Sequence, residues 1–224
     1  MKTQYLPSEI NEALIVNALE ITQSTYRKLD PGWYLYRKLL EYSDAQKFKT
    51  EFIELVYVTL SAWNMNSRAA KLQDFDLFEK SIVQNKKQLI ALFDKTIFDL
   101  NKVELKDEIY FLFNSLDLVH IGKPPLVTFS KTMHFFLPKL ISPIDRRYTL
   151  TYFYNNVNVP NTIEKQFAKF WAIQQKYLGI ATEYNLSNFV DNKWNSTIPK
   201  VVDNIIIGIC KIKEGLKTKT IEEI

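Results

Sequence analysis

The residues of this chain that are best suited to chemistry are concentrated between Thr128 and Phe153, in the stretch TFSKTMHFFLPKLISPIDRRYTLTYF. Lys131, His134 and Asp145 lie there among apolar residues and two prolines. A lysine amine that is shielded from water can act as a nucleophile, and a nearby carboxylate can stabilise positive charge that develops in a reaction. Histidine can transfer protons near neutral pH. The sequence therefore identifies Lys131, Asp145 and His134 as candidate catalytic residues.

Two helices joined by a turn are expected to position these side chains. Thr128 or Ser130 can cap the first helix, because a hydroxyl can accept a hydrogen bond from a free amide of the first turn. The first helix is predicted to end around Pro138, since proline lacks a backbone N–H. Lys131 and His134 are three positions apart, so they are expected to share a face of this helix.

The second helix is predicted to begin at Ser142-Pro143, with Asp145 in its first turn. Serine at the N-cap, proline at the first position and an acidic residue three positions after the serine form a capping box. Asp145 can then act solely as a cap, for about 0.5 to 2 kcal/mol of stability. Arg146 and Arg147 follow in the same turn, where positive charge opposes the helix dipole. They are either solvated or paired with an anionic partner.

Lys131 and His134 each have a purely structural alternative. His134, within MHFFL, can be a hydrogen-bonded histidine of the core. Lys131 lies between Phe129, Met133 and Phe135. It therefore either extends its amine to solvent or pairs with a carboxylate inside the protein.

The same stretch resembles an uncharacterised bacterial protein family with the pattern Ser-Lys-x-Leu-His-x-Leu-Leu-Pro-x-Leu-x-Pro-Pro-Ile-Asp-Arg-x-Tyr-Thr. The matching positions hold Ser130, Lys131, His134, Leu137, Pro138, Leu140, Pro143, Ile144, Asp145, Arg146, Tyr148 and Thr149. Met133 stands in place of a leucine and Ser142 in place of a proline. A second cluster of that family is similar to an upstream segment, at Trp63, Met65, Asn66, Arg68, Lys71 and Leu72. The family has no assigned activity, so this resemblance identifies a motif without a reaction.

The stretch is also remotely similar to the helix-hairpin-helix DNA glycosylase superfamily, whose members place a lysine at the start of one helix and an aspartate shortly after a proline at the next. Lys131 and Asp145 stand in this order. The resemblance implies that Lys131 attacks the anomeric carbon of a nucleotide and forms a Schiff base, while Asp145 stabilises positive charge on the sugar. Aromatic side chains would then wall a pocket for an extruded base. Glycosylase hairpins carry two closely spaced glycines, whereas HIGKPPLVT contains Gly122 alone.

Charge and composition are compatible with a DNA or RNA partner. The chain has 29 Lys and Arg residues against 25 Asp and Glu residues, a formal net charge of +4. This mild excess suits nucleic acid without requiring it. We expect the nucleic-acid-binding residues to be Lys123, Arg146, Arg147, Ser130 and Tyr148. A single cysteine excludes an internal disulfide and a multi-cysteine metal site, and no metal or cofactor is expected.

The apolar residues recur mostly at the helical spacing of three and four, most clearly in residues 51–63, 163–178 and 197–215. We therefore predict an all-α, compact multi-helix domain of about eight to ten helices, with a glycosylase-like helix-turn-helix junction. Residues 1–224 are expected to form one domain, or two helical lobes that share a core, with a frayed tail at 217–224. No signal peptide or membrane-spanning run is recognisable, which predicts a cytoplasmic protein without a membrane partner.

Two hypotheses about function follow from these patterns. The first is a nucleic-acid-associated helical protein, with a DNA glycosylase or lyase-like activity at a cleft formed by Lys131 and Asp145. The second is a helical interaction or structural protein, in which the motif is a buried network that only defines the fold. An open cleft at Lys131 and Asp145 favours the first hypothesis, and a sealed core favours the second.

Overall fold

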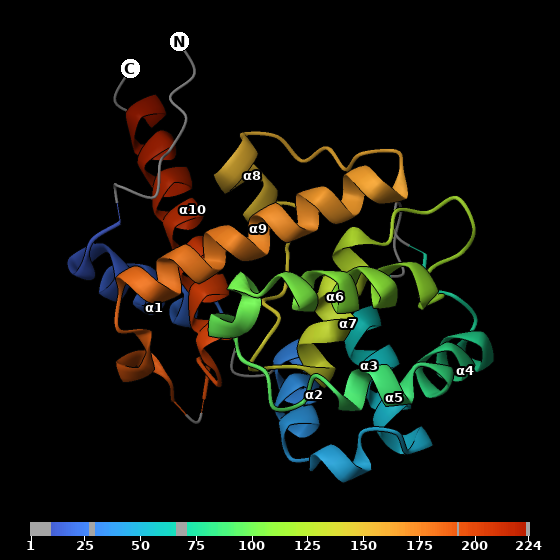
Figure 1. The fold of residues 1–224 in the computed structure, drawn as a ribbon. Helices are drawn as coiled ribbons and strands as arrows, with labels where there is room; N and C mark the ends of the chain where they lie inside the picture. Colours follow the sequence, from blue (N-terminus) through green and yellow to red (C-terminus); the bar gives the residue numbers. More distant parts are fainter. Residues whose placement is uncertain (1–9, 27–29, 66–70, 192, 223–224) are drawn as a thin grey trace.

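Helices make up the regular structure in the computed structural model, which describes residues 10–26, 30–65, 71–191 and 193–222 (Figure 1). The α-helices in these residues are α1 (Glu12–Thr25), α2 (Pro31–Leu40), α3 (Thr50–Ala62), α4 (Phe75–Gln84), α5 (Lys86–Ile90), α6 (Val103–Ser115), α7 (Leu126–Phe136), α8 (Thr149–Tyr154), α9 (Ile163–Glu183) and α10 (Ile198–Glu222). The 3-10 helices are η2 (Asp44–Gln46), η3 (Ile97–Asn101) and η4 (Leu186–Phe189). Extended pairing in this part of the chain is limited to an isolated bridge between Leu72 and Val119. The predicted all-α multi-helix fold is confirmed.

The three most regular apolar patterns correspond to α3, α9 and α10. In α3 the buried residues include Phe52, Val56 and Leu60, which recur at the expected spacing. α10 passes through Gly215 and its backbone stays helical to Glu222. It thus covers most of the segment 217–224, whose fraying stays a prediction.

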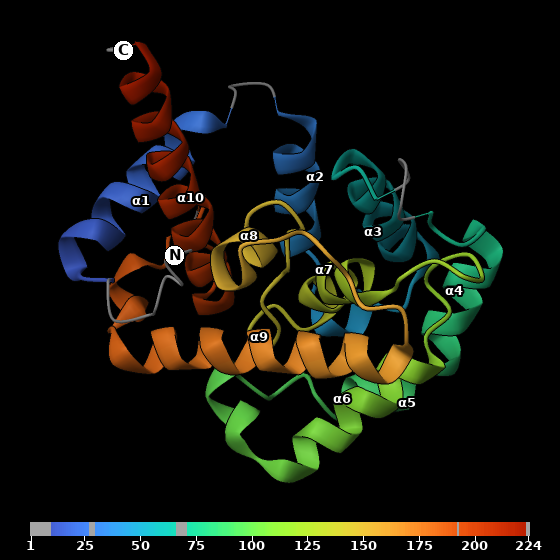
Figure 2. The same ribbon diagram turned by 90° about the horizontal axis from the view of Figure 1, so that it is seen from above.

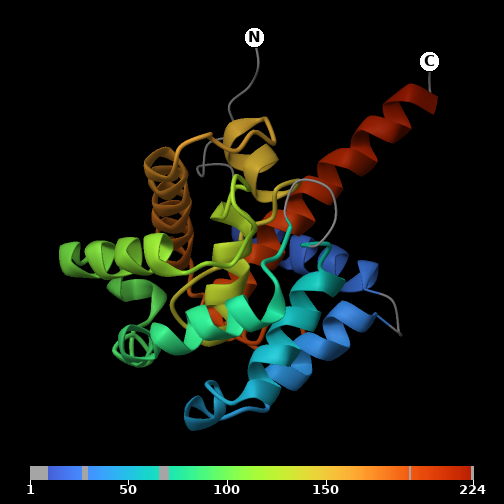
Figure 3. The same ribbon diagram turned by 90° about the vertical axis from the view of Figure 1, so that its right-hand side faces the viewer.

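Helix α7 lies at the centre of the protein, and all eleven of its residues are buried. Figure 2 shows α1 and α10 on one side of α7, with α3 and α4 on the other. α1 packs against α10 and α2 packs against α3, and Figure 3 shows the second pair side by side. The position of α7 explains why Lys131 and His134 lie inside the protein.

Helices α1 and α10 approach each other closely at Gly208. A Cβ atom on Gly208 would overlap the backbone of Ala18 in α1. One turn away, the Thr22 hydroxyl donates a hydrogen bond to the Asn204 carbonyl at 2.7 Å. The first contact requires glycine at position 208, and the second requires the short hydroxyl side chain of Thr22. Together they hold α10 close against α1.

The connection between α7 and α8 differs from the predicted junction. α7 begins at Leu126, so Thr128 and Ser130 lie inside the helix and do not cap it. No helix begins at Ser142-Pro143, because residues 141–145 are not helical and α8 starts at Thr149. The predicted end of the first helix near Pro138 is correct, since α7 ends at Phe136.

The described helices also bear on whether the chain can cross a membrane. None of them combines the length and the apolar character that crossing a bilayer requires.

Candidate active site

The segment 141–144 is held in place by buried side chains from neighbouring helices. Gln174 of α9 accepts a hydrogen bond from the Ser142 N–H at 3.0 Å and donates one to the Ser142 carbonyl at 2.9 Å. Ser130 of α7 accepts a hydrogen bond from the Ile144 N–H at 3.0 Å. The Ser142 hydroxyl is buried without a hydrogen-bond partner among the described residues. The predicted cap at Ser142 is therefore wrong, because side chains distant in sequence bind the amides that a helix start would leave free.

His134 also supports this segment, and its side chain is fully buried. Its Nδ1 lies 2.8 Å from the Ile141 carbonyl, so Nδ1 carries the proton and donates it. Its Nε2 then accepts a hydrogen bond from the Tyr36 hydroxyl at 2.8 Å, and that hydroxyl lies 2.7 Å from the Ser196 hydroxyl. Burial lowers the pKa of His134 to about 3. His134 is therefore a neutral histidine of the core, which places Tyr36.

Asp145 combines a cap with a position beside Lys131. Its Oδ1 accepts hydrogen bonds from the N–H groups of Arg147 at 2.8 Å and Tyr148 at 3.0 Å. Its own N–H donates to the Thr149 hydroxyl at 3.0 Å. These bonds turn Oδ2 toward Lys131, whose Nζ lies 3.6 Å away. Asp145 therefore lies before α8 and stabilises the turn at residues 146–148, and it is not in the first turn of a helix as the sequence predicts.

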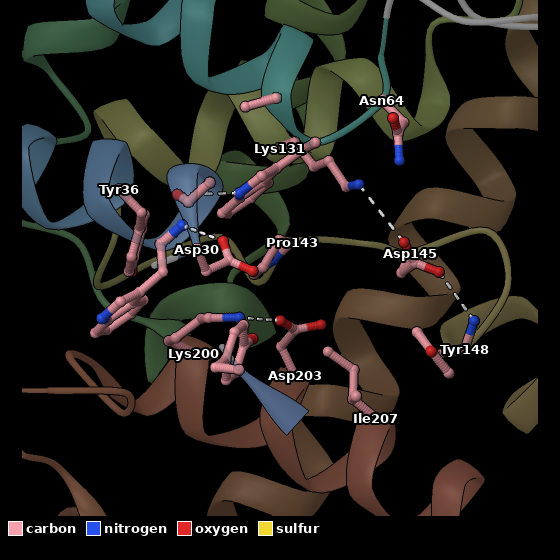
Figure 4. Close-up of a pocket in the computed structure, with 15 residues that line it drawn as sticks. Asp30, Tyr36, Asn64, Lys131, Pro143, Asp145, Tyr148, Lys200, Asp203 and Ile207 are labelled. Carbon is pink, nitrogen blue, oxygen red and sulfur yellow. Dashed lines mark hydrogen bonds and ion pairs between the residues drawn. The ribbon is translucent and has the colours of Figure 1, made fainter. Parts of the chain in front are cut away.

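Lys131 and Asp145 both line a cavity of about 380 Å³. The cavity lies between α2 and α3 on one side and α10 on the other, with α7 and residues 143–148 completing its wall. Figure 4 shows the Lys131 amine directed toward Asp145 and the cavity. The Lys131 side chain is 7% exposed and that of Asp145 is 31% exposed. The pair therefore lies where a buried interior meets an opening to solvent.

Aromatic side chains form much of the wall. Tyr26, Trp33, Tyr36 and Trp63 all line the cavity. The Trp33 ring stacks on Trp194 with centroids 4.1 Å apart, and Trp194 stacks on Tyr26 at 4.3 Å. Aromatic side chains on a cavity wall can pack against a flat aromatic ligand, which suits such a ligand to this cavity.

A second charged pair lines the cavity, and the sequence analysis missed it. Lys200 Nζ lies 2.5 Å from Asp203 Oδ2, and each residue is 4% exposed. Burial acts to lower the pKa of Lys200, but Asp203, Tyr26 and Tyr36 together raise it above its ordinary value. Lys200 therefore stays protonated. The sequence does contain a feature that could have identified this pair. A lysine and an aspartate stand three positions apart within the largely apolar helical stretch IPKVVDNIII.

Two buried lysines lie close to one tryptophan. The Lys131 amine lies 5.5 Å from the centroid of a Trp63 ring, and the Lys200 amine lies 5.9 Å from one. These distances are typical of cation–π contacts. Trp63 belongs to the upstream cluster of the first resemblance. In that cluster Met65 contacts the Thr128 hydroxyl at 3.9 Å, while Asn66 and Arg68 lie outside the described residues.

The predicted nucleic-acid-binding arginines lie on the surface beside the cavity. Arg146 is exposed, and its Nε donates a hydrogen bond to the Val157 carbonyl at 2.7 Å. Arg147 is exposed and pairs with Glu214 of α10 at 3.1 Å. Both guanidinium groups are therefore partly engaged within the protein.

The other three predicted nucleic-acid-binding residues lie in different surroundings. Tyr148 lines the cavity, and Lys123 is exposed in the turn before α7. Ser130 is fully buried, so its expected surface role is corrected: it braces the segment that carries Asp145. Behind Tyr148, burial raises the pKa of the Cys210 thiol to about 11, so this thiol stays protonated.

Four lysines lie near α8, in addition to Arg146 and Arg147. Figure 2 shows α8 between α9 and α10, and these two helices carry the four lysines. Lys176 of α9 lies 5.1 Å from the Phe153 ring centroid, and Lys169 lies 4.4 Å from that of Tyr154. We define the α8 basic surface as Arg146, Arg147, Lys169, Lys176, Lys211 and Lys213. From α10, Lys211 lies 5.9 Å from the Tyr148 ring centroid and Lys213 lies 5.5 Å from that of Tyr152.

Comparison with known proteins does not extend this description. No family model, curated protein or solved structure matches the chain. The two resemblances stated above therefore stay predictions, and the function is argued from the site itself.

Proposed function

We propose that this protein binds nucleic acid and acts on a nucleotide at the cavity, with Lys131 as the nucleophile and Asp145 as its proton acceptor. The observation that carries the proposal is the position of both groups on the wall of an aromatic cavity of about 380 Å³. Enzymes that act on a base must extrude it from its stack into such a pocket. The proposed class is a DNA glycosylase or lyase-like enzyme.

The first step is the deprotonation of Lys131. Asp145 Oδ2, 3.6 Å from Nζ, takes up the proton and leaves a neutral amine. Nζ then forms a bond to C1′ of the sugar, while the bond from C1′ to the base nitrogen breaks. The electron pair of the broken bond leaves with the base, which receives the proton held by Asp145.

The second step opens the sugar ring. The bond from C1′ to O4′ breaks, O4′ takes a proton from the attached nitrogen, and a carbon–nitrogen double bond forms. The product is an iminium ion between Lys131 and the sugar. Water hydrolyses this intermediate and returns the free amine.

The α8 basic surface supports the choice of a nucleic acid as partner. It adjoins the cavity at Tyr148, which lines the cavity and has Lys211 and Arg147 near its ring. A strand whose phosphates lie along this surface has a base within reach of the cavity. Basic groups beside aromatic rings are the usual means of binding a single strand.

The alternative is that Lys131 and Asp145 only stabilise the fold. A buried ion pair can define a structure without catalysing a reaction. Under this alternative, loss of Lys131 lowers the thermal stability and has no chemical consequence.

The test is borohydride trapping on DNA that contains abasic sites and damaged bases, because borohydride reduces the iminium ion to a stable amine. We expect an adduct with the native chain and none with Lys131→Ala or Lys131→Met. Asp145→Asn should slow its formation, and Lys86→Met, a change at an exposed lysine of α5, should leave it unchanged. A broad panel of lesions that gives no adduct dependent on Lys131 would falsify the proposal.

A further inference from the structure

The buried pair of Lys200 and Asp203 is not explained by the proposed reaction. Each residue is more than nine-tenths buried, and both line the cavity. Figure 4 shows the pair on the opposite side of the cavity from the Lys131 amine. A buried ion pair is often no more stable than apolar side chains of similar size. Stability alone therefore does not explain this pair. Because both charged groups lie on the wall of a cavity, they can bind a ligand there.

The pair presents complementary hydrogen-bonding groups side by side. The Lys200 ammonium has three N–H donors, one of which is used by Asp203 at 2.5 Å. The Asp203 carboxylate offers acceptors only. The raised pKa of Lys200 keeps its donors in place at neutral pH.

The surrounding rings restrict what can reach these groups. Tyr36 lines the cavity and is itself held by His134 at 2.8 Å and Ser196 at 2.7 Å. Trp63 lies close to both lysines. A flat ligand can lie against these rings with its edge at Lys200 and Asp203.

We propose that Lys200 and Asp203 bind the hydrogen-bonding edge of a heteroaromatic base, with Lys200 donating to an acceptor and Asp203 accepting from the adjacent N–H. Such an edge occurs in a lactam, as in hypoxanthine, guanine or uracil, and in an amidine, as in adenine or cytosine. Lys200 and Asp203 are thus specificity-determining residues on the side opposite the reacting amine. The inference rests on the proposed function for the identity of the ligand, but binding of a base does not require Lys131 to react.

The test measures nucleoside binding by quenching of tryptophan fluorescence, because Trp33 and Trp63 line the cavity. The probes are inosine against 1-methylinosine, and adenosine against N6,N6-dimethyladenosine. In each pair methylation removes the N–H group that would donate a hydrogen bond to Asp203. We expect the unmethylated nucleoside to bind about tenfold more tightly or better, since a buried acceptor left without a donor is costly.

The matched variant replaces both charges, as Lys200→Met with Asp203→Leu. An apolar pair of similar volume generally leaves a fold intact, and thermal unfolding checks this. The double variant should bind both members of each probe pair equally, while Lys86→Met, at an exposed lysine of α5, should keep the discrimination.

Three outcomes would overturn the inference: no nucleoside binding by the native chain, equal binding of the paired probes, or discrimination that persists in the folded double variant. The variant Lys131→Met should retain the discrimination. If it does, and borohydride yields no adduct with the native chain, the proposed reaction fails while the recognition site stands. If borohydride yields an adduct but the native chain binds both members of each probe pair equally, the proposed reaction stands and the recognition site fails.

Discussion

At the scale of single residues, the motif divides into two groups with different surroundings. Ser130 and His134 bond the backbone of residues 141–144 and are fully buried. Lys131 and Asp145 face the cavity. The structural interpretation of His134 therefore fits its contacts, whereas the lysine and the aspartate lie where the first hypothesis needs them.

His134 is predicted to make the fold sensitive to acid. Burial lowers its pKa to about 3 from an ordinary value of 6.5. Between these values the unfolded chain binds more protons than the folded chain, so this contribution is complete above about pH 6.5 and is lost as the pH falls. We expect a loss of about 2 kcal/mol between about pH 7 and pH 5, from roughly 1.4 kcal/mol per pH unit, measured by urea unfolding.

The control for this prediction is the other histidine. His134→Gln should lower stability at neutral pH but flatten its dependence on pH, and His120→Gln should keep the native slope. Equal slopes for the native chain and His134→Gln would show that His134 is not the group that titrates.

At the scale of elements, α10 determines the cavity because it carries Lys200 and Asp203. Its position depends on the close approach to α1 at Gly208 and on the hydrogen bond from Thr22 to Asn204. A shift of α10 would move the charged pair away from the aromatic wall. Packing in the middle of the helix, at Gly208, and ligand binding near its start, at Lys200 and Asp203, are therefore coupled.

Gly208→Ala is predicted to destabilise the protein. The added methyl group would overlap the Ala18 backbone, and such overpacking costs about 1 to 3 kcal/mol. Gly215→Ala in the same helix is the matched control, because its Cβ would meet no described heavy atom within 4 Å. The control should be neutral or stabilising by up to about 1 kcal/mol. Chemical denaturation of both variants compares them, and equal stabilities would contradict the close packing of α1 and α10.

At the scale of the whole molecule, the α8 basic surface adjoins the opening of the cavity. The formal net charge is only +4, so this local grouping matters more than the total charge. Its lysines flank α8 from α9 and α10, the two α-helices that follow α8 in the chain. A long anionic partner can therefore contact several lysines while one nucleotide enters the cavity.

Binding of single-stranded DNA is predicted to weaken steeply with salt. Each phosphate contact contributes about −0.7 to the slope of log affinity against log salt concentration. Lys211→Gln and Lys213→Gln should each make the slope shallower by about that amount, as measured by fluorescence anisotropy. Lys86→Gln and Lys87→Gln on α5 are controls, since Figure 1 shows α5 far from α8. If the protein did not bind single-stranded DNA at low salt, or if the α5 variants changed the slope as much as the α10 variants, a strand would not lie on this surface.

The sequence alone determined the all-α class and the most regular helices, α3, α9 and α10, because the spacing of apolar residues is local and a helix needs only its own backbone bonds and one buried face. It also located Lys131 and Asp145 through their types and order. Ser142 was misplaced because its amide can bond either within a new helix or to a distant side chain. Gln174, thirty-two positions away, takes that amide in the folded protein.

The tertiary structure alone decided which charges share a cavity. Lys200 and Asp203 lie about seventy positions from Lys131 in the chain, and no local pattern relates them to it. They face one cavity because α10 packs on α1 while α7 occupies the centre. The physical reason is that periodicity tells which face of a helix is buried, whereas the neighbours of that face depend on how all the helices fill the same interior.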